Sequence, residues 1–190
     1  MEADLAVAAK TRVVVVTAWL LVAGGAGYLL APASARLALL SLLVCGASVL
    51  FIARRHAAKT LHGELLVAFT FSLALLPVVL AGRESILPSW VAMGIWTAVF
   101  GLQTLTVHAV KARGGFLGFL STIIAVALLV AAVLGAKMIF PMLGALSGPA
   151  LVSIVVMASR PGQKRLKRIG WAFVCADITA LVVILLAWPS

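Results

Sequence analysis

The sequence predicts an all-α fold, a polytopic transmembrane bundle of about seven helices, and three observations support this prediction. First, 64% of the 190 residues are hydrophobic and only 11% are charged, a composition far from that of soluble domains. Second, apolar segments recur along the chain, each long enough to cross a hydrocarbon core of roughly 30 Å as a helix. Third, basic residues gather in alternate connections between these segments. No connection can hold a second domain, so we expect a single transmembrane domain over residues 1–190.

Seven apolar segments can be marked off, with six or eight helices as the alternative counts. They cover approximately residues 13–30, 37–53, 65–81, 90–110, 116–136, 139–158 and 169–188.

The basic residues orient these segments. When the connections are assigned alternately to two sides, one side collects twelve Lys and Arg residues and the other only three. Short loops rich in Lys and Arg stay in the cytoplasm, which is the positive-inside rule. We therefore expect a multi-pass protein of the bacterial cytoplasmic (inner) membrane, with its N-terminus in the cytosol and its C-terminus outside. The larger group is Lys10, Arg12, Arg54, Arg55, Lys59, Lys111, Arg113, Arg160, Lys164, Arg165, Lys167 and Arg168; the smaller is Arg36, Arg83 and Lys137.

The first segment resembles a signal peptide but is expected to be a retained helix. Two basic residues precede it, and the small-residue turn 31–35 follows it. However, its run of about 18 residues exceeds the usual 7 to 15 of a signal h-region. Glu2 and Asp4 are also atypical of a purely basic leader.

The next three segments have recognisable ends and one expected distortion. Arg54-Arg55-His56 closes the second segment as a basic anchor. Pro77 lies inside the third segment and should bend it, because proline removes a backbone hydrogen bond. Trp90 opens the fourth segment as an interfacial anchor.

The last three segments include one that is expected to be irregular. Only Lys137-Met138 separates the fifth segment from the sixth, so these two should form a close antiparallel hairpin. The sixth combines the G-x-x-x-G spacing of Gly144 and Gly148 with two prolines, which predicts a kinked or partly unwound helix. Trp171 and Trp188 bracket the last segment at its two interfaces.

Asp177 is the sharpest functional signal. It lies eight residues beyond Ile169, or roughly 12 Å into the last segment at 1.5 Å per residue. A carboxylate at that depth is costly, so it should be paired, hydrogen-bonded, protonated or exposed to water.

Other polar side chains reach similar depths on the same side of the membrane. By the same arithmetic Gln103 lies about 10 Å and Ser153 about 8 Å from the nearer helix end. His108, His62 and Glu64 lie near the rim. This distribution predicts a polar cavity open to the cytosol or inner leaflet, formed by these residues and Asp177.

The residues leave two interpretations of this cavity open. Ser and Thr commonly bond to their own helix carbonyls, and one Asp can clasp Gln103, Thr104 or His108 across helices. Alternatively, Asp177 belongs to a ligand or proton site. The sequence favours a non-enzymatic accessory or structural subunit of a membrane complex. The alternative is a carrier or binder of a small or amphipathic anion around Asp177, and a lesser alternative is a lipid-modifying enzyme.

The sequence offers no catalytic residues, metal site or cofactor site. It lacks a nucleophile elbow, a Walker loop and a His-Glu-x-x-His motif. His56, His62 and His108 lie in a loop or near helix ends, which disfavours haem ligation across the membrane. Cys45 and Cys175 are expected to be small core residues.

The net charge of +10 is best explained by topology and by contact with anionic lipid headgroups. We therefore expect membrane lipids as partners, other membrane-protein subunits as a second class of partner, and no nucleic acid.

Three stretches resemble the YwiC-like family of uncharacterised bacterial integral membrane proteins, over roughly residues 54–190. They are the basic loop that runs from Arg54-Arg55-His56 into Leu61-His62-Gly63-Glu64-Leu65-Leu66, the stretch from Gly101 to Arg113, and Arg165-Leu166-Lys167-Arg168-Ile169-Gly170-Trp171. The resemblance implies an integral membrane protein and brings no established activity. The His-Gly-Ala-Trp stretch with which family members usually open is absent.

Overall fold

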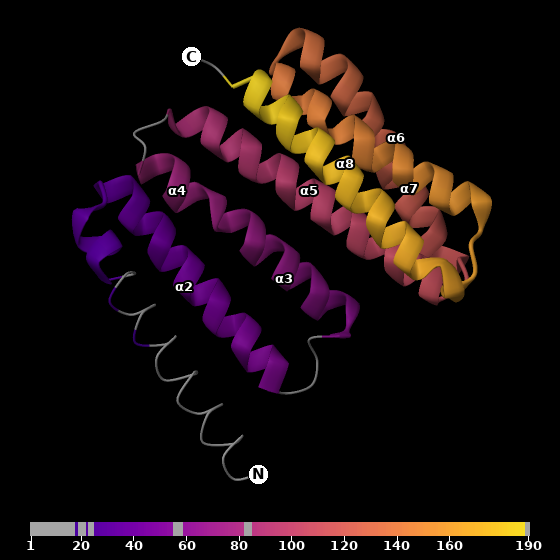
Figure 1. Cartoon of the computed structure of the whole chain (residues 1–190), viewed down its shortest axis with the longest axis horizontal. Coiled ribbons are helices and arrows are strands. Elements are labelled where there is room, and N and C mark those ends of the chain that lie inside the picture. Colours follow the sequence, from indigo (N-terminus) through magenta and orange to yellow (C-terminus); the bar gives the residue numbers. More distant parts are fainter. Residues whose placement is uncertain (1–17, 19–21, 23–24, 55–58, 82–84, 189–190) are drawn as a thin grey trace.

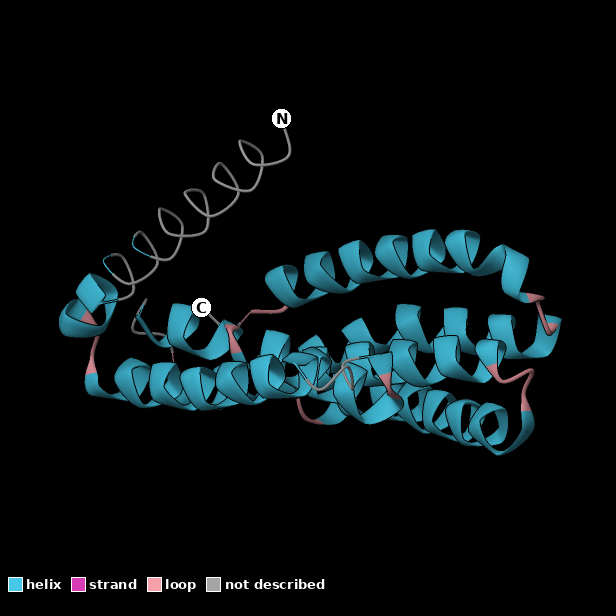
Figure 2. Cartoon of the chain, turned by 90° about the horizontal axis from the view of Figure 1, so that it is seen from below, coloured by secondary structure: helices cyan, strands magenta, loops and turns pink. Residues whose placement is uncertain are grey.

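The computed structural model describes residues 18, 22, 25–54, 59–81 and 85–188, which form helices joined by short turns, with no strand among them (Figure 2). The all-α prediction is therefore confirmed. In chain order the elements are α2 (Ala33–Arg54), α3 (Leu61–Leu73), α4 (Leu75–Ala81), α5 (Ile86–Lys111), α6 (Gly115–Met138), the 3-10 helix η2 (Pro141–Leu146), α7 (Ser147–Ser159), the 3-10 helix η3 (Gln163–Arg165) and α8 (Leu166–Leu186).

Six stretches of the described chain are long and apolar enough to cross a membrane. They match six of the seven predicted segments, so the protein is a multi-pass membrane protein. The segment predicted over residues 13–30 lies largely outside the described residues. The six stretches are Ala33–Arg54, Leu61–Ala81, Ile86–Lys111, Gly115–Met138, Pro141–Ser159 and Gln163–Leu186.

The helices run up and down, and two basic connections lie together at one end of the bundle, here called the basic end (Figure 1). These connections are residues 111–115 and 159–166. Their proximity is confirmed by Gln163, whose Nε2 donates a hydrogen bond of 2.9 Å to the Lys111 carbonyl. Two of the connections that the sequence assigns to the cytoplasm thus lie side by side.

Helix α5 is the centre of the bundle. It packs against α3, α4, α6, α7, α8 and η2, whereas α2 packs on α3 and α4 at the edge (Figure 1). The largest apolar core surrounds Val99 and Met142, which have no exposed surface. A smaller core around Ala35 and Leu76 joins α2 to α3 and α4.

Two of the predicted segments are irregular at the places where prolines predicted a distortion. In the segment predicted over residues 65–81, α3 ends at Leu73 and α4 starts at Leu75. Pro77 has no N–H to donate to the Leu73 carbonyl, so the helical bonding is interrupted there. The segment predicted over residues 139–158 begins with the 3-10 helix η2 and becomes α-helical only at Ser147. Both predicted distortions are confirmed.

Gly148 lets α7 approach α8 closely. A Cβ atom built on Gly148 would lie 3.6 Å from the Ala176 carbonyl oxygen, at ordinary van der Waals contact. An alanine would therefore fit at this position, whereas a longer side chain would extend from a Cβ that already contacts Ala176.

Candidate functional site

A groove of about 490 Å³, here called the membrane groove, lies between α3, α5 and α8. Helices α3 and α8 each pack on α5, with no extensive contact between them, so a gap remains over the α5 surface. The groove lies within the membrane-spanning stretches. Its lining consists of Glu64, Val67, Ala68, Phe71, Phe100, Gln103, Thr104, Val107, Gly170, Phe173, Val174 and Asp177.

Asp177 and Gln103 meet in this groove, as the depth arithmetic predicted. Gln103 Nε2 donates a hydrogen bond of 2.5 Å to Asp177 Oδ1, and both side chains are half-buried. On α8 the neighbouring Phe173 and Ala176 are buried, so the helical repeat turns Asp177 toward α5. The amide partner offsets part of the cost of placing a carboxylate at this depth.

A second polar group stands at the rim of the groove. Glu64 Oε2 lies 3.0 Å from His108 Nε2, and Glu64 Oε1 lies 3.7 Å from Lys111 Nζ. Glu64 occupies the first turn of α3, which Thr60 caps by accepting a hydrogen bond from the Gly63 N–H. A carboxylate is favourable near a helix N-terminus.

The remaining two predicted site residues do not line the groove. His62 is exposed in the first turn of α3. Ser153 is fully buried in a separate hydroxyl cluster with Thr106 and Ser121. Thr106 Oγ1 lies 2.8 Å from Ser121 Oγ, 3.2 Å from Ser153 Oγ and 2.8 Å from the Leu102 carbonyl oxygen.

The hydroxyl cluster joins α5, α6 and α7 and has a packing role. Other hydroxyls, such as those of Thr70 and Ser72, bond to the carbonyl four residues earlier in their own helix. These hydroxyls therefore make structural hydrogen bonds, which is one of the two interpretations that the sequence left open.

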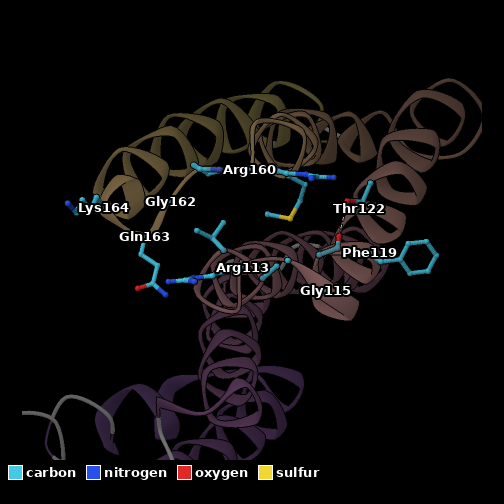
Figure 3. A pocket seen from close by; sticks show the side chains of 14 residues that line it. Arg113, Gly115, Phe119, Thr122, Arg160, Gly162, Gln163 and Lys164 are labelled. Atoms are coloured by element: carbon cyan, nitrogen blue, oxygen red, sulfur yellow. Dashed lines mark hydrogen bonds between the residues drawn. The ribbon is translucent and has the colours of Figure 1, made fainter.

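A larger cavity, here called the basic pocket, was not anticipated from the sequence. It measures about 1050 Å³ and lies at the basic end, between the α5–α6 turn and the α7–α8 connection (Figure 3). The sequence analysis assigned the basic side chains of these two connections to topology and to contact with lipid headgroups, but not to a cavity. The pocket is lined by Ala109, Val110, Arg113, Gly114, Gly115, Gly118, Phe119, Thr122, Met157, Arg160, Pro161, Gly162, Gln163 and Lys164.

The described residues contain no group of three or more His, Cys, Asp or Glu side chains placed to hold a metal ion. Both cysteines are free. Cys45 is half-buried, but Cys175 is exposed on α8, so its prediction as a core residue was wrong. The apolar pattern indicates the depth of Cys175 in the span but not the face of the helix that carries it.

No family model, curated protein or solved structure matches the chain. Function is therefore inferred from the geometry of the two cavities.

Proposed function

We propose that the protein is a binder or carrier of a small amphipathic cation, which it holds in the membrane groove at Asp177. The supporting observation is the Asp177 carboxylate, which lines an otherwise largely apolar groove within the membrane-spanning part of the bundle. Intramembrane carboxylates commonly mark substrate or ion pathways.

The charges of the groove favour a cation over the anion expected from the sequence. Its two ionisable lining residues, Glu64 and Asp177, are both acidic. Glu64 is already paired with His108 and Lys111, whereas the hydrogen-bond partner of Asp177 is the neutral amide of Gln103. A cation beside Asp177 would replace lost hydration with a charge interaction, whereas an anion would be repelled.

The apolar lining suits the body of such a ligand. Phe71, Phe100 and Phe173 line the groove together with aliphatic side chains. Aromatic rings bury large apolar areas and attract cations to their faces. Because Phe71 and Val174 of the lining are exposed on the outer surface of membrane-spanning helices, a membrane-dissolved ligand can enter laterally.

The same proposal includes a location and an orientation. We place the protein in a bacterial cytoplasmic membrane with the basic end toward the cytosol, on the strength of the uneven distribution of Lys and Arg. We also propose that it is a divergent member of the YwiC-like family, on the three stretches that resemble it.

Direct binding to the purified full chain tests the function. The probe is tetraphenylphosphonium, an apolar cation, and the matched variant is Asp177→Asn, which removes the charge and keeps a hydrogen-bonding group beside Gln103. We expect the affinity to fall by about tenfold or more, the range for losing one charge interaction in an apolar site. Thr179→Asn, on the exposed face of α8, should bind as the wild type does. Equal affinity of the Asp177→Asn variant would refute the proposal.

A second candidate is a non-enzymatic accessory subunit, in which Asp177 is a structural clasp. It is favoured by the internal pairing of Asp177 with Gln103 and of Glu64 with His108. Extraction in mild detergent followed by native mass spectrometry separates the two candidates. A stoichiometric protein partner without cation binding supports the subunit, and a lone bundle that binds the cation supports the carrier.

A further inference from the structure

We infer that the basic pocket binds the phosphate-bearing headgroup of an anionic lipid. This site is distinct from the membrane groove, because the two cavities share no lining residue. The inference therefore stands apart from the proposed function, and either can fail alone.

Three cations from two connections surround the pocket. Arg113 follows α5, and Arg160 and Lys164 belong to the connection between α7 and α8; Figure 3 shows the two connections facing each other across the hollow. The acidic side chains of the described chain, Glu64 and Asp177, line the other cavity. Among described residues, none of the three cations is paired with a carboxylate. Two guanidinium groups and one ammonium group that line the same cavity suit a phosphate, which arginine binds in bidentate fashion.

The backbone holds both arginines where glycine is normally preferred. The Gly114 N–H bonds to the Ala109 carbonyl at 2.8 Å and the Arg113 N–H to the Val110 carbonyl at 3.2 Å. This is the Schellman pattern that ends a helix, with Arg113 at its left-handed position (φ 58°). Arg160 ends α7 in the same conformation (φ 43°).

A left-handed conformation is unfavourable for a residue with a Cβ. Gly114 and Gly115 also have positive φ, of 93° and 65°, which glycine adopts without strain. Among the described residues Arg113 and Arg160 are the non-glycine residues with positive φ, and both line the basic pocket. Strained positions of this kind cluster at ligand-binding sites. The arrangement places two long cationic side chains at the mouth of one cavity.

The wall of the pocket suits a lipid better than free phosphate. Val110, Phe119 and Met157 give it an apolar side. Phe119 is 64% exposed, and Figure 3 shows its ring pointing outward from the bundle along α6. A lipid can therefore place its phosphate among the cations while its acyl chains follow the apolar surface of α6. Basic pockets between transmembrane helices are known to suit anionic headgroups.

Helix α6 adds a further donor group to the same wall. It starts at Gly115, and its N-cap residue Gly114 has no side chain to bond the first N–H groups. Free N–H groups at a helix start favour phosphate. They supplement the three side-chain cations.

The test measures lipid retention by the full chain in vesicles or nanodiscs of phosphatidylcholine with or without phosphatidylglycerol. The variant R113G/R160G removes both arginines and relieves both left-handed positions, so its melting temperature should not fall. The control K167Q/R168Q removes two exposed basic residues of the same end that lie outside the pocket. We expect phosphatidylglycerol affinity to fall at least about tenfold in the first variant and less than about threefold in the control.

Two further comparisons complete the test. R113Q/R160Q removes the same charges without added glycine and should lose the lipid equally; wild-type affinity in either arginine variant overturns the inference. An equal loss in K167Q/R168Q also overturns it, because binding would then reflect general attraction at the basic end. Competition by inorganic phosphate distinguishes a lipid headgroup from free phosphate as the source of the anion. Phosphate should displace phosphatidylglycerol only weakly. If phosphate bound as tightly as the lipid does, a lipid site would be ruled out.

Discussion

Replacing Thr106 with valine tests whether the hydroxyl cluster stabilises the bundle. The change keeps the size of the side chain but removes the shared partner of Ser121 and Ser153, both fully buried. Interhelical hydrogen bonds in membranes contribute about 0.6 to 1.7 kcal/mol each. Two such bonds are lost, and the orphaned hydroxyls recover part of the loss by bonding to their own helix carbonyls. We expect the free energy of unfolding to fall by about 2 kcal/mol.

Equilibrium unfolding of the full chain in mixed micelles of mild detergent and dodecyl sulfate measures this loss. Thr97→Val is the matched control, because the side chain of Thr97 bonds to no described residue other than Met93 of its own helix, at the backbone carbonyl. It should cost less than about 1 kcal/mol. The triple variant T106V/S121A/S153A leaves no orphaned hydroxyl and should be more stable than T106V alone. If T106V costs no more than the control, the cluster does not join the three helices energetically.

Three further predictions concern packing, the rim and orientation. Gly148→Leu should lower the free energy of unfolding by about 1 to 3 kcal/mol, because it forces α7 away from α8, whereas Gly94→Leu, where an added Cβ meets nothing within 4 Å, should be nearly neutral; equal losses in the same unfolding assay would contradict this. Glu64→Gln should cost only about 0.5 kcal/mol, since the pair is partly exposed, and a loss of several kcal/mol would show that the rim is a buried ion pair. Cysteines introduced at Lys137 and at Lys164 should react with an impermeant thiol reagent from opposite faces of the membrane in a Cys45- and Cys175-free background; labelling from one face would contradict the proposed orientation.

Hydropathy and charge spacing were sufficient to predict most of the fold. The spans depend on the length of apolar runs, and the turns depend on charged or small residues, both of which are local properties of the chain. The irregular third and sixth spans were also predictable, because a proline inside a helix removes a bond whatever surrounds it. Depth placed Asp177 and Gln103 in one cavity but left Gln103, Thr104 and His108 as alternative partners of Asp177, and the structure shows the bond to Gln103.

Depth does not determine which way a side chain faces. Ser153 was expected beside Asp177, but it lies on the α7 face that meets Thr106. Cys175 was expected in the core, but it lies on an exposed face of α8. Hydropathy is high around most of each helix in this chain, so an amphipathic pattern to fix the rotation of a helix is largely missing.

The basic pocket was unpredictable for a different reason. Its residues come from two turns separated by almost fifty positions, and their meeting depends on how α5 and α7 pack. The left-handed conformation of Arg113 is also hidden, because the adjacent Gly114 is the residue that sequence rules would place there. In the sequence, the basic and glycine-rich turn at residues 111–115 indicated topology and contact with lipid headgroups. A binding site is indicated only by the structure, in which this turn and Arg160 line the same cavity.

The two cavities share helix α5 but no lining residue. Gln103, Thr104 and Val107 of α5 line the membrane groove, and Ala109 and Val110 of the same helix line the basic pocket. A substitution that rotates or shifts α5 will therefore disturb both cavities together, and its effects cannot be assigned to either. The groove can instead be altered by substitutions in α8, and the pocket by substitutions in the α7–α8 connection. Both leave α5 unchanged, so they separate cation recognition from lipid recognition.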